Sequence, residues 1–138
     1  MRERTMIRYF DHEKLTVYQE AIRFVAWVSD LLEMVPKSMA VHNQLDRAST
    51  SIPLNIAEGN GKFTPPDRCR FFDISKGSAL ESAACLDVLF SKERISQEKA
   101  DEGKKILRSI VSMLVGLIKS NHPDRIYEES VEYRTSRD

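Results

Sequence analysis

The sequence is poor in the features that mark disulfide scaffolds, membrane segments and strongly charged binding surfaces. Its 138 residues include only two cysteines, and 21 basic side chains are balanced by 21 acidic ones. No uninterrupted apolar run approaches the roughly 18 residues of a membrane span, and the N-terminus lacks the apolar core of a signal peptide. We therefore expect a cytoplasmic protein without a membrane partner and without a general electrostatic attraction to nucleic acid.

The two cysteines, Cys69 and Cys85, fall in one predicted helix. The intervening turns of helix separate them by about 24 Å, so they cannot form a disulfide within the chain. This spacing favours a reducing compartment such as the cytoplasm. We interpret both cysteines as packing residues or partly exposed bystanders.

Residue patterns that carry catalysis or ligand chemistry are also missing. The three histidines, His12, His42 and His122, lie in different segments, and none begins a metal-ligand spacing. The string 59–62 resembles part of a phosphate loop, but Ile56 and Phe63 stand where that motif needs glycine and a hydroxyl residue. No serine lies in a nucleophile-elbow context. We predict no enzymatic activity, no cofactor and no metal.

What the sequence does contain is helical periodicity, in four successive segments. Apolar residues recur at steps of three and four, and no stretch alternates with period two for long enough to indicate a strand. Short connections favour antiparallel neighbours, so we predict an all-α, antiparallel up-down-up-down four-helix bundle. The expected helices cover about 13–35, 39–59, 65–90 and 97–120. The predicted division is an N-terminal extension 1–12, the bundle 13–120 and a polar tail 121–138.

Helix boundaries follow from proline, glycine and hydroxyl residues. Pro36 ends the first helix, whereas Pro53 is expected to bend the second without breaking it, because the apolar seam keeps its phase on both sides. The second helix is expected to end at Gly59-Asn60-Gly61, residues that accept the left-handed geometry of a C-cap. Thr64 and Ser96 are the predicted N-caps of the last two helices.

The predicted core is defined by one apolar line on each helix. The second helix supplies Val41, Leu45, Ala48, Ile52 and Ile56. The third helix is expected to bury Phe71, Ile74, Ser78, Cys85 and Leu89, with Ser75 and Ser82 allowing close approach of a neighbour.

A continuous polar stripe accompanies the apolar seam of the second helix. Its members lie within an arc of about 80° on the helical wheel: Gln44, Arg47, Ser51, Asn55 and Glu58. The stripe could face solvent, form hydrogen bonds that fix helix register or join subunits, or bind a ligand or nucleic acid; we favour the second interpretation. Glu81 is placed at the edge of the third helix's apolar arc, so we expect it to pair with Arg47.

Two further surfaces are candidate contact sites. Trp27 and Met34 are placed opposite the main apolar ridge of the first helix, which favours an oligomer interface. Basic residues on the third and fourth helices form a candidate nucleic-acid surface: Arg68, Lys76, Lys99, Lys104, Lys105 and Arg108.

A specific string in the second and third helices resembles a known family. The chain contains Q-L-x-R-A-x-x-S-I-P-x-N-I-A-E-G-x-G at 44–61, followed by R-F-F-x-I-x-x-G-S-x-x-E at 70–81. This pattern is similar to that of small bacterial four-helix bundle proteins. They include proteins encoded in intervening sequences of large-subunit rRNA genes and the accessory variability determinant of diversity-generating retroelements.

The resemblance implies a homo-oligomer, typically a pentamer, without known enzymatic activity. For the retroelement branch it implies binding to a reverse transcriptase and to nucleic acid through a strongly basic surface. This chain departs from that pattern because its net charge is zero. We therefore expect an assembly or adaptor protein that docks a protein partner, such as a reverse transcriptase or another RNA-handling protein. Direct binding of RNA or DNA through the basic residues is the alternative.

Overall fold

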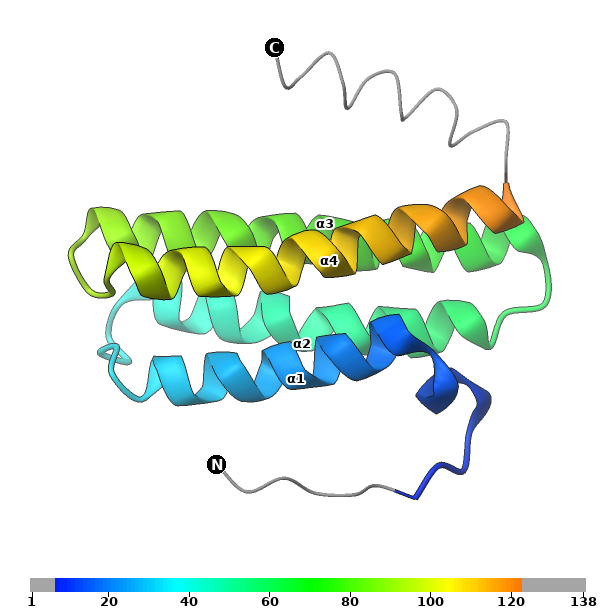
Figure 1. Ribbon diagram of the computed structural model, residues 1–138, viewed down its shortest axis with the longest axis horizontal. Coiled ribbons are helices and arrows are strands. Elements are labelled where there is room, and N and C mark those ends of the chain that lie inside the picture. Colours follow the sequence, from blue (N-terminus) through cyan, green and yellow to red (C-terminus); the bar gives the residue numbers. More distant parts are fainter. Residues whose placement is uncertain (1–6, 123–138) are drawn as a thin grey trace, which may run out of the picture.

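Four long helices form an antiparallel bundle in the computed structural model, which describes residues 7–122. They run up-down-up-down, and each packs against two neighbours (Figure 1). In this view α2 and α3 lie behind α1 and α4. The elements are a 3-10 turn η1 (Asp11–Lys14) and the helices α1 (Thr16–Leu32), α2 (Ala40–Asn60), α3 (Pro65–Ser91) and α4 (Gln97–Asn121). The predicted fold class is confirmed, whereas most of the predicted tail lies outside the described residues.

Helix α2 remains one helix through Pro53, as predicted. It has 21 residues, and Pro53 is buried inside it. The neighbouring carbonyl of Ile52 accepts a hydrogen bond of 2.9 Å from the Ser75 hydroxyl of α3. This bond ties α2 to α3 beside the proline, whereas the helical donor that Pro53 lacks is the one for the Ser49 carbonyl, one turn earlier.

Hydroxyl side chains begin the last two helices, but the predicted left-handed glycine is absent. Thr64 accepts from the backbone N–H of Asp67, and Ser96 accepts from that of Lys99 at 3.0 Å. Gly61 has a φ of −84°, so the expected left-handed C-cap of α2 is wrong. Among the described non-glycine residues, Glu93 has a positive φ, of 59°; it lies in the turn between α3 and α4.

The predicted apolar seam of α2 is buried along its whole length, whereas the core face of α3 is rotated from the prediction. Ile74 is 45% exposed, and Phe71 and Ser78 are only half-buried. The buried residues of α3 are Cys69, Phe72, Ser75, Ala79, Ser82, Cys85, Leu86 and Leu89. Small side chains thus lie at the centre of the helix contact, because α2 approaches α3 closely there.

Gly59 shows how close that approach is. A Cβ atom added at Gly59 would lie 2.8 Å from Cε1 of Phe72 and 3.0 Å from the backbone oxygen of Arg68. Arg68 in turn donates hydrogen bonds to the backbone oxygen of Asn60 at 2.7 Å and to Oδ1 of Asn121 at 3.0 Å. These contacts join the ends of α2, α3 and α4.

Candidate interaction face on α2 and α3

A polar pocket of about 330 Å³ opens between α2 and α3. Its lining consists of Gln44, Arg47, Ala48, Ser51, Ser78 and Glu81. Three members of the predicted polar stripe therefore line one pocket together with Glu81. Antiparallel packing produces this arrangement, because it places the stripe of α2 beside the half-buried edge of α3.

Hydrogen bonds on one side of this pocket link the two helices. The Ser78 hydroxyl lies 2.8 Å from the Ser51 hydroxyl and donates to it. The Asn55 amide donates to both the hydroxyl and the backbone oxygen of Ser51, each at 2.9 Å. Ser51 and Asn55 therefore act within the chain, where they help to fix the register of α2 against α3.

The charged residues of the pocket behave differently. Arg47 and Glu81 are both exposed, and neither makes a hydrogen bond or ion pair with another residue in the range 7–122. The predicted Arg47–Glu81 ion pair is therefore absent from the described structure. Glu81 was expected at the edge of a buried arc, but Ile74 and Val88, which define that arc, are themselves exposed.

The remaining two members of the stripe also point outward. Glu58 is exposed and forms an ion pair with Lys62 of the same helix end, at 3.3 Å. Gln44 is exposed and has no hydrogen-bond partner among the described residues. The stripe thus divides into an inner pair that bonds within the chain and an outer set that faces away from it.

Exposed apolar side chains continue the same stripes on both helices. Leu54, seven residues after Arg47 on α2, is 63% exposed. Ile74 and Val88, seven residues before and after Glu81 on α3, are 45% and 40% exposed. A spacing of seven returns to the same side of a helix, so these residues and the two charges share one surface. We call it the outer α2–α3 face: Gln44, Arg47, Leu54, Ile74, Gly77, Glu81 and Val88.

Packing within the chain does not require a glycine at position 77. It lies inside α3, between Ile74 and Glu81 on the outer α2–α3 face, and a Cβ atom added there would meet no atom within 4 Å. Glycine in a helix interior costs about 1 kcal/mol relative to alanine. The sequence interpretation did not single out Leu54 or Gly77 as site residues, although a glycine inside a strong helical pattern was the available signal.

The buried Cys85 thiol lies one turn after Glu81 on α3. Burial raises the pKa of the Cys85 thiol, and the negative charge of Glu81 raises it further. The thiol is therefore protonated near neutral pH and is a poor nucleophile. No cluster of three potential metal ligands occurs among the residues that the structure describes. Within the same range, none of the helices combines the length and apolar character of a membrane span.

Trp27 does not lie on the outer side of α1, where the sequence placed it, and it is only half-buried, so its role in an oligomer interface stays a prediction. Its indole N–H donates to Oε1 of Glu102 at 2.5 Å, and its ring stacks on Phe24 with centroids 5.7 Å apart. The indole bond, followed by the charge of Lys99, lowers the pKa of the Glu102 carboxyl. Trp27 therefore packs between α1 and α4, while Met34 is 61% exposed.

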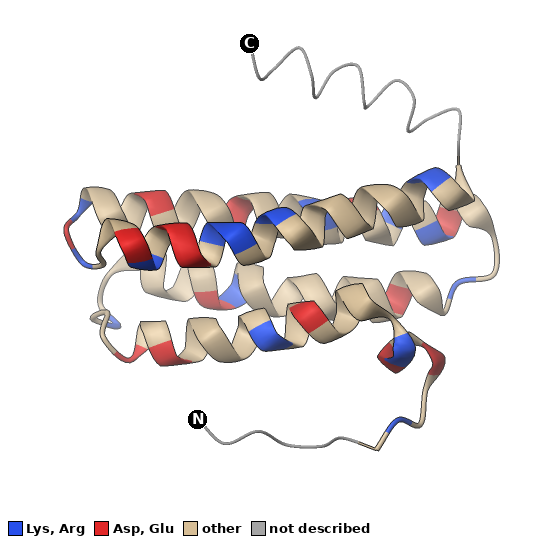
Figure 2. Cartoon of the chain, in the orientation of Figure 1, with Lys and Arg blue, Asp and Glu red and all other residues tan. Residues whose placement is uncertain are grey.

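The basic residues proposed for nucleic-acid binding do not form one free surface. Arg68 bonds within the chain as described above, Lys99 contacts Glu102 at 3.5 Å, and Lys104 pairs with Asp87 at 2.7 Å. Lys76 also has an interaction partner. Lys105 and Arg108 are exposed without an ion pair in the described structure. Figure 2 shows charges of both signs distributed over the helices, which disfavours a strong general attraction to phosphate.

Comparison with known proteins agrees with the fold. A crystal structure of a protein of unknown function from the S23 ribosomal protein family of Bacteroides thetaiotaomicron is similar, with a TM-score of 0.71 and 23% identity. The match covers 75% of this chain and 99% of that one. None of the curated proteins compared with the sequence matches it. Residues 13–116 match the family described as 23S rRNA-intervening sequence protein, and the chain belongs to this family.

Proposed function

We propose that the protein is a non-enzymatic assembly module that forms homo-oligomers through the outer α2–α3 face. The observation that carries the proposal is the pair of exposed, oppositely charged side chains, Arg47 and Glu81, without partners in the described structure. They lie among the exposed apolar residues Leu54, Ile74 and Val88. Apolar area supplies the driving force for association, and charges supply its specificity.

A second copy of the chain is the occupant that this face fits best. One positive and one negative group on the same surface are self-complementary, because Arg47 of one copy can meet Glu81 of the next. Guanidinium and carboxylate form directional, bidentate hydrogen bonds, which fix the relative orientation of two subunits. The fixed Ser51–Ser78 hydrogen bond holds the two charge-bearing helices in register. Contact of this face with the same face of a second copy is two-fold and closes at a dimer, so the pentamer that the family resemblance implies would need a second, different face in addition.

The assembled copies would then serve as an adaptor. A symmetric oligomer presents the same subunit surface more than once, so a protein partner can be held by more than one weak contact at the same time. This repetition explains how a neutral, non-catalytic bundle can act on a partner such as an RNA-handling protein. The proposal places the function in the assembly and not in the pocket of a single chain.

Charge reversal tests the proposed contact. We expect wild-type protein to show, by light scattering, a solution mass at least twice the 15.9 kDa of one chain. Arg47→Glu and Glu81→Arg should each lower that mass, because each variant brings two like charges together at the interface. The double variant should restore it. Asp30→Lys, an exposed charge change on α1, is the matched control and should leave the mass unchanged.

A monomeric wild-type protein at tens of micromolar would overturn the proposal. Retention of the oligomer in both single variants would show that another face forms the contact. Helicity and unfolding measured in parallel exclude misfolding as the cause of a lower mass.

Gly77→Ala provides a test that is independent of charge. Because a Cβ atom meets open space there, the exchange should stabilise the isolated subunit by up to about 1 kcal/mol. The added methyl group should nevertheless weaken assembly, since it stands where a second copy would approach α3. Gly116→Ala on α4 is the matched control: it also meets no atom within 4 Å and should stabilise without a change in solution mass. Equal masses for both variants would contradict a close approach at Gly77.

A further inference from the structure

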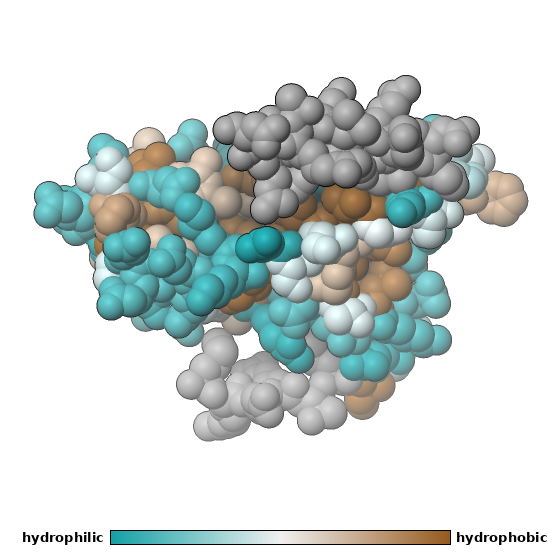
Figure 3. Space-filling model, turned by 45° about the horizontal axis from the view of Figure 1, so that its top comes forward, coloured by the Kyte–Doolittle hydropathy of each residue, from teal (hydrophilic) through white to brown (hydrophobic). Residues whose placement is uncertain are grey.

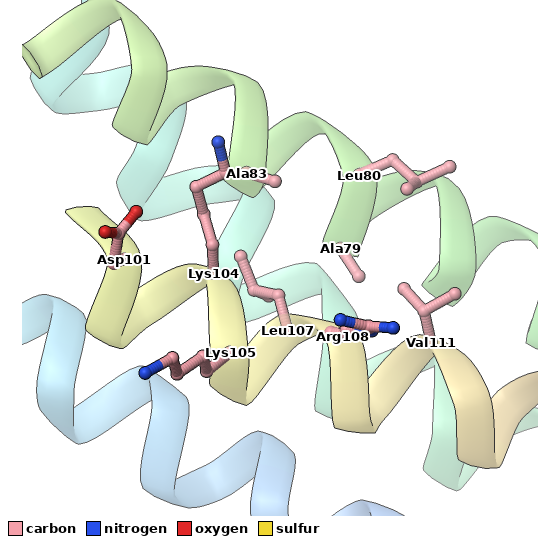
Figure 4. A pocket seen from close by; sticks show the side chains of 9 residues that line it. All are labelled: Ala79, Leu80, Ala83, Asp101, Lys104, Lys105, Leu107, Arg108 and Val111. Carbon is pink, nitrogen blue, oxygen red and sulfur yellow. The ribbon is translucent and has the colours of Figure 1, made fainter. Parts of the chain in front are cut away.

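A second groove, of about 370 Å³, lies between α3 and α4. Leu80, Ala83, Leu107 and Val111 provide its apolar lining, and Lys104 and Arg108 belong to its charged rim (Figure 4). Leu80 is 52% exposed, so part of this apolar surface is open. Figure 3 shows hydrophobic residues between hydrophilic ones on the side where α3 and α4 come forward. The groove is separate from the outer α2–α3 face.

Two basic residues of the rim have no ion-pair partner in the described structure. Lys104 is occupied by Asp87 at 2.7 Å, whereas Lys105 and Arg108 form no ion pair with any residue in the range 7–122. Asp101 is the acidic residue of the lining. An apolar floor beside exposed basic residues fits a segment that carries acidic and apolar side chains together.

We propose that this groove binds residues 124–133 of the same chain. That segment contains four acidic residues and one basic one, so its charge is opposite to that of Lys105 and Arg108. It also contains four apolar or aromatic residues that suit the floor formed by Leu80 and Val111: Ile126, Tyr127, Val131 and Tyr133.

The chain has the length to make this contact. Helix α4 ends at Asn121, and the helix between Arg108 and that end is about 20 Å long. Six residues of extended chain after His122 span a similar distance, about 20 Å, which brings Glu128 and Glu129 level with Arg108. Pro123 lacks the N–H needed to continue α4, so the segment can turn back toward the groove.

Attachment to the same chain makes even a weak contact effective. A short tether holds the segment at a local concentration in the millimolar range. Bound there, the segment would cover the exposed part of Leu80 and neutralise Lys105 and Arg108.

Hydrogen exchange of the full-length protein, followed by mass spectrometry, tests the proposal directly. We expect amides in 124–133 to exchange at least about tenfold more slowly than in an unstructured peptide of the same sequence. Lys105→Glu combined with Arg108→Glu should abolish this protection. Adding Glu128→Lys and Glu129→Lys to that variant should restore it. Lys92→Glu combined with Arg94→Glu, two exposed basic residues in the turn between α3 and α4, is the matched control and should retain it.

Val131→Asp gives a second test that leaves the bundle itself unaltered. It should remove the protection by placing a charge against the apolar floor. Unprotected 124–133 amides in the wild type would overturn the proposal. Protection that rises with protein concentration would also overturn it, because the segment would then bind a neighbouring copy. Retention of the oligomer in the charge-reversal variants of the outer α2–α3 face bears on the proposed function alone, so the two failures are distinguishable.

Discussion

Replacing Trp27 with alanine is expected to lower the free energy of unfolding by about 3 kcal/mol, as for other packed aromatic residues. The indole stacks on Phe24 and donates to Glu102, so the exchange removes apolar contacts and one hydrogen bond between α1 and α4. Lys99 also loses the ring beneath its ammonium group, which lies 5.8 Å from the ring centroid. Urea unfolding followed by circular dichroism measures the change.

Met34→Ala is the appropriate comparison, because the sequence assigned Met34 and Trp27 to the same contact surface. Met34 is 61% exposed, so its truncation should alter stability by no more than about 0.5 kcal/mol. The solution mass of folded Trp27→Ala should equal that of the wild type, because Trp27 joins α1 to α4 within one chain. A lower mass at full helicity would place Trp27 in the oligomer interface.

The fold was predictable because three of the four helices have a single clear apolar line. In α2 the seam from Val41 to Ile56 is buried throughout, and the helix passes through Pro53 as expected. In α3 large apolar residues occur on two sides, at Phe71 and Ile74 as well as at Phe72. Periodicity alone could not show which side faces the core. The side that carries the small residues Ser75, Ala79 and Ser82 is the buried one.

The candidate site was only partly predictable for the same reason. The polar stripe of α2 is local in sequence, and the sequence placed Arg47, Ser51 and Asn55 on one side correctly. Their partners depend on how α3 is rotated against α2, which local sequence does not determine. Ser78 therefore appears as the unexpected partner of Ser51, and Glu81 turns outward without pairing with Arg47.

Trp27 was misplaced because a helical wheel shows direction but not the size of the opposing residue. The opposing residue is Gly103 on α4, where an added Cβ atom would lie 2.5 Å from Cη2 of Trp27. The absence of a side chain on α4 allows the indole to reach across from the edge of α1. A glycine inside the fourth helix, opposite a large aromatic residue in the first, is the sequence signal for this contact.

Gly103→Ala should therefore destabilise the protein even though alanine is the better helix former. The new methyl group would also lie 2.6 Å from Cδ1 of Leu86, which is fully buried. Trp27 is held by Phe24 and Glu102, so neither neighbour can withdraw freely. Overpacking of this kind costs about 1–3 kcal/mol, more than the gain of up to about 1 kcal/mol in helix propensity.

Gly116→Ala on the same helix measures the effect of helix propensity alone, because its Cβ atom meets open space. The two variants should shift the urea midpoint in opposite directions, with Gly103→Ala lowering it and Gly116→Ala raising it. Combining Gly103→Ala with Trp27→Ala should cost less than the sum of the two single changes, since removal of the indole makes room for the methyl group. Strict additivity would mean that Trp27 and Gly103 do not share the contact between α1 and α4.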